Sequence, residues 1–145
     1  MSDPHIEHET YAHIPRAHEV HANPDTPVKV HDLPECMQKP VDGKSAAKWA
    51  YERLILYIRN FEEQLDASHE VAMGFAGSDA GVMKIEGMGY FDPDIVTFYG
   101  RDANGTKTQL VQHVSQMSVI LRAMPIQNEK EPPNRIGFRL ASELD

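Results

Sequence analysis

The residues best suited to chemistry lie in and beside the stretch FYGRDANGTKTQLVQH, residues 98–113. His113 closes this stretch, and an imidazole can act as a general base when a carboxylate orients it and a nucleophile lies nearby. By residue type the candidate partners are Asp92, Asp94 and Ser115. The ordinary alternative is a half-buried histidine that hydrogen-bonds to the backbone. The chain has no Gly-x-Ser-x-Gly, His-Glu-x-x-His or glycine-rich phosphate loop, so we assign no catalytic residue.

The middle of the same stretch, DANG at 102–105, is typical of a turn. An Asp accepts hydrogen bonds from turn amides, and Gly105 takes a positive φ without penalty. A three-residue loop with a bulge would place Phe98 opposite Leu110 in a hairpin, whereas a two-residue Asn-Gly turn would pair Phe98 with Val111. In either register the glutamines of the second strand fall on opposite faces. They therefore do not converge on one site.

Cations and aromatic rings indicate a second kind of site, for an anionic small molecule such as a nucleotide. Arginine binds phosphate oxygens and an aromatic ring can stack on a base. We expect Arg135 and Arg139 on the outer face of a last strand at residues 135–141, although two arginines there also fit an ordinary solvated strand face. The ligand-binding candidates are Arg135, Arg139, Tyr99, Tyr90 and His113.

A histidine-rich N-terminal stretch raises the question of metal binding. Six of the eight histidines lie in residues 1–43, with acidic residues between them. Imidazole and carboxylate groups suit zinc or nickel. The stretch has no paired cysteines, however, and Pro15 divides the histidine cluster. We therefore assign no specific metal site and no cofactor.

Composition limits the classes of function. The chain has 145 residues, of which 41% are hydrophobic and 25% charged, as expected for one soluble globular domain. A net charge of −8 argues against general binding to nucleic acid or to anionic membranes. The single cysteine, Cys36, excludes an intrachain disulfide and suits a reducing cytoplasm. We expect neither a signal peptide nor a membrane-spanning helix.

Proline usage divides the chain into two unequal parts. Residues 1–43 hold six of the ten prolines and a net charge of −5, from three basic and eight acidic residues. Proline interrupts helices and removes hydrogen-bond donors from strands. We interpret 1–43 as a proline- and histidine-rich, mostly disordered arm. Residues 44–145 are then a single domain.

The pattern of the second part predicts one helix followed by strands. Apolar residues recur three and four positions apart through residues 45–66, which predicts a long helix with Ser45 as its N-cap. Runs bounded by turn residues then predict strands at 70–76, 82–90, 94–100 and 106–113.

The end of the chain is expected to hold one short helix and one strand. Helical spacing favours a helix at 115–124 that Pro125 ends, with a strand left open because Val119 and Ile120 are β-branched. Alternation of apolar and polar residues predicts a half-buried strand at 135–141. The expected fold class is α+β: an antiparallel β-sheet of about five strands with one long N-terminal helix and one short helix.

Four stretches carry a resemblance to a known family: LDASHEVAMGF, GYFDPDIVTFYGRDANG, QLVQHVSQMSVIL and NRIGF. Over roughly residues 48–140 the chain resembles an uncharacterised bacterial and prophage domain-of-unknown-function family, number six-one-seven-three. The resemblance implies a bacterial cytoplasmic setting and a domain that excludes the arm. It implies no established activity, cofactor or catalytic residue.

Together these observations favour a non-catalytic binding or protein-interaction module that forms a homodimer or higher homo-oligomer. A sheet with apolar side chains on both faces needs cover on both, and a two-fold interface provides it most simply. Alternatively, the arm folds back over the exposed face. Its apolar side chains available for this are Val28, Val30 and Leu33. Two further classes stay open: a binder of an anionic small molecule, and a small hydrolase or nuclease centred on His113.

Overall fold

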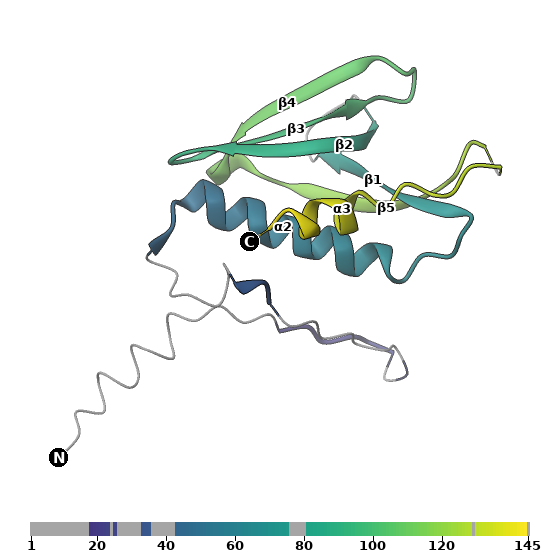
Figure 1. Ribbon diagram of the computed structural model, residues 1–145, viewed down its shortest axis with the longest axis horizontal. Coiled ribbons are helices and arrows are strands. Elements are labelled where there is room, and N and C mark those ends of the chain that lie inside the picture. Colours follow the sequence, from purple (N-terminus) through teal and green to yellow (C-terminus); the bar gives the residue numbers. More distant parts are fainter. Residues whose placement is uncertain are drawn as a thin grey trace. The chain divides into compact units, whose positions relative to one another are not determined.

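The computed structural model describes residues 18–23, 25, 33–35, 43–75, 81–128 and 130–144. Ser45–Glu143 form one compact unit, which contains all the elements named below. In chain order these are α2 (Ala46–Glu62), β1 (His69–Phe75), β2 (Val82–Phe91), β3 (Ile95–Arg101), β4 (Lys107–His113), the 3-10 helix η3 (Val114–Gln116), β5 (Val119–Pro125) and α3 (Ile136–Ser142). The five strands form one antiparallel sheet in the order β4-β3-β2-β1-β5 (Figure 1).

The long helix α2 begins where a serine can cap it. The Oγ atom of Ser45 accepts the N–H of Lys48 at 3.0 Å, which satisfies one of the free donors in the first turn. The N–H of Ala47 donates to the carbonyl of Pro93 at 3.0 Å, so the start of the helix is fixed to the turn between β2 and β3. Figure 1 shows α2 running below the β2–β3–β4 part of the sheet, with α3 beside it.

The β3–β4 hairpin contains the three-residue loop. The Oδ1 atom of Asp102 accepts the N–H of Asn104 at 2.9 Å, and Gly105 has a φ of +79°. Phe98 lies opposite Leu110, as this loop predicts. The alternative register, with Val111 opposite Phe98, is wrong.

The strand register gives the β2–β4 part of the sheet one buried and one exposed face. Val96 and Phe98 are completely buried, whereas Tyr99, which points the other way, is 45% exposed. Phe75 packs edge-on against Phe98 with ring centroids 5.1 Å apart, although β2 lies between their strands. The sheet therefore curves around its buried side. Other buried apolar side chains include Ile55, Ile58, Met73, Ile85 and Met88.

The predicted helix at 115–124 is wrong. Only the short η3 is helical, and Val119–Pro125 is the edge strand β5, paired with β1 along its whole length. The strand alternative is therefore confirmed. β-Branched Val119 and Ile120 favour extended backbone, and β5 gives β1 a hydrogen-bonding partner on that side.

The predicted strand at 135–141 is also wrong, because this segment forms the short helix α3. Ile136 and Leu140 share a strand face by alternation, but they also share a helix face because they are four residues apart. Gly137 lies against α2, where an added Cβ would come within 2.7 Å of the backbone nitrogen of Arg59. This close helix–helix contact selects the helix. The fold class is nevertheless as predicted: α+β, with five strands, one long helix and one short helix.

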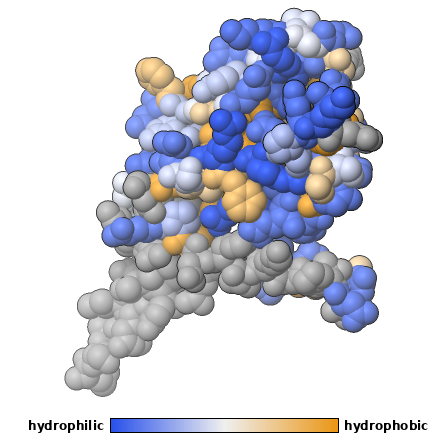
Figure 2. Space-filling model, turned by 45° about the vertical axis from the view of Figure 1, so that its right-hand side comes forward, coloured by the Kyte–Doolittle hydropathy of each residue, from blue (hydrophilic) through white to orange (hydrophobic). Residues whose placement is uncertain are grey.

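The surface of the described residues is mixed. Figure 2 shows a mainly hydrophilic face on which hydrophobic side chains are exposed in small, separate areas. Among the described residues, no helix combines the length and the hydropathy needed to cross a membrane.

Candidate functional site

His113 lies where β4 meets η3, and both of its ring nitrogens are engaged. Nε2 lies 3.0 Å from the Oδ2 atom of Asp94, and Nδ1 lies 2.7 Å from the Oγ atom of Ser115. Nδ1 also accepts the backbone N–H of Ser115 at 3.1 Å. In the neutral ring the proton is therefore on Nε2 and is donated to Asp94. The structure thus brings together three of the four residues that the sequence analysis grouped by type.

Carboxylate, imidazole and hydroxyl groups in contact are also the components of a catalytic triad, but here their geometry fits a structural role. The side chains of Asp94 and His113 are 42% and 46% exposed. The N–H of Ser115, which an acyl-transfer site would aim at an oxyanion, is bonded to the imidazole instead. In addition, the N–H of Val114 donates to the carbonyl of Asp94 at 2.9 Å. These contacts join the end of β4 to the start of β3.

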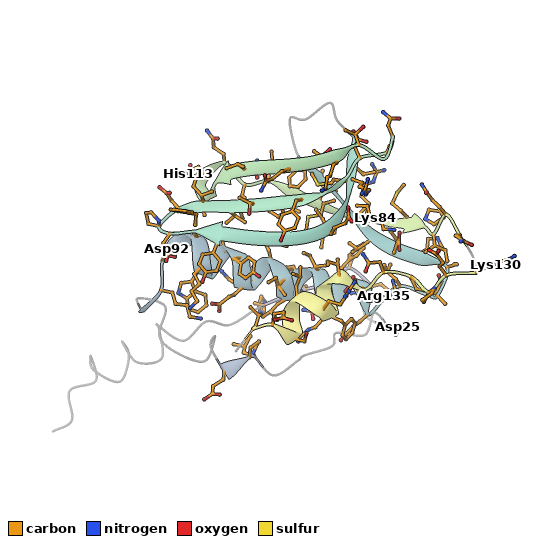
Figure 3. The ribbon with its side chains drawn as sticks, turned by 45° about the horizontal axis from the view of Figure 1, so that its top comes forward. Asp25, Lys84, Asp92, His113, Lys130 and Arg135 are labelled. Atoms are coloured by element: carbon orange, nitrogen blue, oxygen red, sulfur yellow. The ribbon has the colours of Figure 1, made fainter. Side chains whose placement is uncertain are left out.

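Asp92, the fourth residue of that group, has a different partner. Its Oδ1 atom is hydrogen-bonded to the hydroxyl of Ser45 at the start of α2. Figure 3 shows Asp92 and His113 at the same end of the sheet, with Lys84 toward the opposite end.

Tyr99 lies on the exposed face of the sheet, over a glycine. Gly87 is its partner across the β2–β3 pair, and a Cβ added there would lie 2.2 Å from the tyrosine ring. The ring therefore rests directly on the backbone of β2. A shallow depression of about 430 Å³ beside it is lined by Tyr99, Lys107, Thr108 and Gln109.

The cations near Tyr99 differ in how they are paired. The Nε atom of Arg101 lies 3.3 Å from Glu86, and the Nζ atom of Lys84 lies 2.9 Å from Glu70. Lys107 has no ion-pair partner among the described residues. Its charge is therefore the one on this face most readily available to an anion.

Tyr90 is separated from Tyr99, although both were candidates for stacking on the same ligand. The register places Tyr90 on the opposite face of the sheet, where its ring centroid lies 5.0 Å from that of Tyr51 on α2. Tyr90 contributes to the helix–sheet contact. Of these two tyrosines, Tyr99 is the one on the exposed face.

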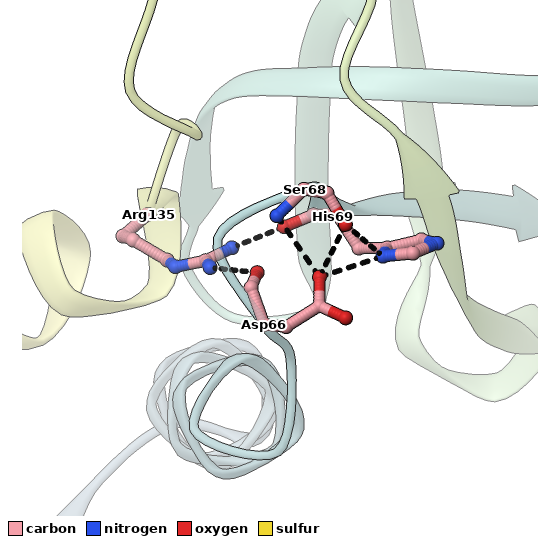
Figure 4. Close-up of polar contacts among 4 residues, drawn as sticks. All are labelled: Asp66, Ser68, His69 and Arg135. Atoms are coloured by element: carbon pink, nitrogen blue, oxygen red, sulfur yellow. Dashed lines mark hydrogen bonds and ion pairs between the residues drawn. The ribbon is translucent and has the colours of Figure 1, made fainter. Parts of the chain in front are cut away.

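Arg135 supports the fold. Its guanidinium donates to the backbone carbonyls of His69 at 2.7 Å and Asp66 at 2.8 Å, which ties the start of α3 to the start of β1 (Figure 4). In the same cluster the Oδ1 atom of Asp66 accepts the hydroxyl of Ser68 at 2.6 Å and lies 2.8 Å from Nδ1 of His69. These hydrogen bonds, that of His69 first, hold the pKa of Asp66 well below its usual range.

The expected position of the two arginines is therefore wrong. Arg135 precedes α3 and Arg139 is an exposed residue within it, so neither lies on a strand face. The reason is the helical conformation of this segment, which the alternating pattern did not reveal.

Comparison with known protein families shows which family the chain belongs to. The sequence profile of DUF6173, described as a family of unknown function, matches residues 41–139. The chain belongs to the DUF6173 family. No curated protein and no solved structure matches it. The matched residues include α2 and all five strands of the sheet.

This DUF6173 domain also contains buried carboxylates that the sequence analysis missed: Glu52, Glu62 and Glu70. The Oε1 atom of Glu62 accepts the N–H of Phe138 at 3.2 Å in the first turn of α3, and its Oε2 atom has no hydrogen-bond partner among the described residues. Burial raises the pKa of Glu62, and the N–H groups of α3 oppose this effect. The available signal was its spacing of four residues from Ile58, which puts it on the buried stripe of α2.

No metal site is evident in the described part of the DUF6173 chain, where no three His, Cys, Asp or Glu side chains come together as ligands. Of the arm histidines, His18 and His21 are described and exposed, with Nε2 of His21 3.6 Å from Glu19. The other arm histidines lie outside the described residues, as do Val28 and Val30.

Proposed function

We propose that this DUF6173 domain is a non-catalytic interaction module that associates with itself through the exposed face of β2, β3 and β4. The observation that supports this proposal is the exposure of large apolar side chains there: 75% for Phe91, 60% for Val111 and 45% for Tyr99. An exposed apolar patch of this kind marks an interaction surface in many soluble proteins. A second copy of the same chain can cover it with an identical patch.

We further propose a bacterial or prophage cytoplasm as the setting of the module. The four stretches quoted above support the first part through their resemblance to bacterial and prophage sequences. The single cysteine, Cys36, supports the second, because extracellular domains of this size more often carry disulfides.

A concentration series by light scattering tests the self-association. We expect a monomer–dimer equilibrium at micromolar concentrations, because three short strands give a small interface. Val111→Glu should shift the protein to monomer without unfolding it, since exposed substitutions usually change stability by within about 0.5 kcal/mol.

The matched control is Tyr57→Glu on α2, where the side chain is 53% exposed and lies outside the proposed surface. This variant should associate like the natural chain. A natural chain that stays monomeric at every concentration would contradict the proposal, as would equal association of both variants.

A second candidate function is binding of an anionic small molecule such as a nucleotide in the depression beside Tyr99. The exposed ring of Tyr99, the ammonium of Lys107, which no described residue pairs, and the amide of Gln109 support it, because together they can stack on a planar group and bind a phosphate. Calorimetric titration with nucleoside monophosphates tests it, and Lys107→Ala should abolish any heat of binding. We propose no hydrolase or nuclease at His113, because its ring is held by the turn that also carries Ser115, the serine to which it is hydrogen-bonded.

A further inference from the structure

The exposed face of β2, β3 and β4 consists of four rows of residues that cross the three strands. From one end to the other the rows are Phe91–Ile95–His113, Gly89–Thr97–Val111, Gly87–Tyr99–Gln109 and Lys84–Arg101–Lys107. Apolar and neutral side chains fill the middle rows. The first and last rows differ in charge.

Acidic groups border the first row. Asp94 is bonded to His113 and 42% exposed, and Asp92 is exposed in the same turn. Neither has a Lys or Arg partner among the described residues. The last row is cationic. Lys84 and Arg101 are paired, whereas Lys107 has no ion-pair partner in the part of the chain that the structure describes. Figure 3 shows Asp92 and His113 at one end of these strands and Lys84 toward the other.

This distribution is self-complementary for one orientation of two copies. We propose that two copies pack face to face about a two-fold axis that crosses the strands, so that the first row of each copy lies over the last row of the other. The proposal rests on the self-association proposed above and names its geometry. Each β4 then faces the β4 of the other copy, so Lys107 of each copy lies over His113 of the other. There it meets the carboxylate of Asp94, which is bonded to that imidazole, and this contact occurs twice in the dimer.

The other simple two-fold axis runs parallel to the strands and is disfavoured by charge. It would lay each row over the same row of the other copy, with Lys107 over Lys84 and Arg101 over its own equivalent. Like charges at an interface are unfavourable, so electrostatics selects the first arrangement.

Packing is compatible with the same choice. Facing sheets lie about 10 Å apart with their side chains interdigitated. Gly87 and Gly89 leave the β2 strip of this face without side chains of its own, and the neighbouring strand β3 covers it with Tyr99 at Gly87 and Thr97 at Gly89. Phe91 of the second copy then lies over Lys84, the β2 residue of the last row, where a cation beside its ring is favourable.

Charge reversal tests the geometry. Lys107→Glu alone and Asp94→Lys alone each create two like-charge contacts in a homodimer, so each should weaken association at least about tenfold. An equimolar mixture of the two variants should recover dimers, because both contacts of the mixed dimer again join opposite charges. Native mass spectrometry distinguishes the mixed dimer by its mass.

Lys130→Glu is the matched control, because it makes the same change in charge at an exposed loop position outside this face. This variant should associate with itself like the natural chain. Mixed with Asp94→Lys, it should not form the mixed dimer that Lys107→Glu forms. If Asp94→Lys fails to fold, a double-mutant cycle of Asp94→Asn and Lys107→Gln should show non-additive losses of association. Recovery in the mixture, or such coupling, supports the arrangement.

The outcomes separate the two proposals. A natural dimer that neither single charge reversal weakens would overturn the two-fold arrangement and leave self-association intact. A natural chain that never dimerises would overturn both.

Discussion

The side chain of Glu62, on α2, accepts a hydrogen bond from a backbone N–H in the first turn of another helix, α3. The residue at the N-cap position of α3, Arg135, makes no side-chain capping bond. The carboxylate of Glu62, at the end of α2, accepts the N–H of Phe138 instead. Burial disfavours the ionised form of a carboxyl group. It therefore raises the pKa of Glu62, even though backbone N–H groups of α3 donate hydrogen bonds to the carboxylate.

We expect replacement of Glu62 to change stability in a pH-dependent way. Because the folded state favours the protonated acid, the contribution of Glu62 to stability is complete below its unfolded pKa and is lost as the pH rises through the higher folded pKa. Glu62→Gln imitates the protonated form and keeps an acceptor for Phe138. It should melt above the natural chain at pH 7, and the difference should shrink toward about pH 4.

Glu62→Ala is the contrasting variant. It leaves the N–H of Phe138 without its acceptor and should lose about 1–3 kcal/mol of unfolding free energy. Thermal denaturation between pH 4 and pH 8 measures both effects. If Glu62→Gln melts below the natural chain at pH 7, the N–H donors of α3 stabilise the ionised carboxylate more than burial destabilises it, and the expected direction of the pH effect is wrong.

Two polar clusters of this domain contain the same three residue types in the same kind of place. Asp94, His113 and Ser115 join strand ends, and the other cluster, shown in Figure 4, lies at the turn before β1. In the second, hydrogen bonds connect Asp66, Ser68 and His69 within one exposed turn, whereas in the first they join His113 to Ser115 nearby and to Asp94 nineteen residues before it. Residue type alone therefore does not separate a catalytic group from a turn, whereas burial and the partners of the backbone N–H groups do.

Among the elements, those controlled by local sequence were predictable. The capped start of α2 depends on the neighbouring residue Ser45 and was predicted correctly. The register of the β3–β4 hairpin depends on the loop that contains Asp102, and it is one of the two registers that the sequence allowed. The final two elements depend on distant partners. Segment 119–125 extends because β1 offers it a full ladder, and α3 forms because Gly137 fits against α2. Their local patterns fit either conformation, so the sequence alone did not distinguish them.

The same difference explains the candidate site residues. His113 and Asp94 were grouped by residue type alone, and the pairing of β3 with β4 brings their strand ends together. Tyr99 lies on the exposed face because strand alternation directs it away from Val96 and Phe98. Arg135 was misplaced because its role depends on the packing of α3 against the turn before β1.

Gly137 gives a test of that packing, because helix propensity and close contact predict opposite signs. Alanine is favoured over glycine in a helix by about 0.8–1 kcal/mol. A Cβ at this position would, however, lie 2.5 Å from Oε1 of Glu62 and 2.9 Å from the Cα of Arg59. We expect Gly137→Ala to lose about 1–3 kcal/mol of unfolding free energy, because backbone atoms of α2 must move.

Urea denaturation measures this change, with Ser142→Ala as the control on the same helix. The hydroxyl of Ser142 donates to the carbonyl of Arg139 in its own turn and the residue is exposed, so the control should stay within about 0.5 kcal/mol of the natural chain. A Gly137→Ala variant more stable than the natural chain would contradict the close packing of α3 on α2.

At the scale of the whole molecule, the compact unit Ser45–Glu143 and most of the net negative charge lie in different parts of the chain. Ser45–Glu143 form a compact unit with its own core, and the family match begins at residue 41. Residues 44–145 carry 11 basic and 14 acidic residues, a net charge of −3, while the remaining −5 of the total of −8 belongs to residues 1–43. The negative charge of residues 1–43 thus adds to the repulsion between copies.

We therefore expect a chain that begins at Asp42 to melt cooperatively and to dimerise at least as readily as the full chain, because its net charge is smaller in magnitude and like-charged proteins repel. Circular dichroism tests the first expectation, and light scattering at equal concentration tests the second. Loss of the cooperative transition would show that residues 1–41 complete the core. If the full chain stays monomeric and only the shortened chain associates, the arm covers the exposed face of β2–β4, and the two-fold contact between copies would form only after the arm is released.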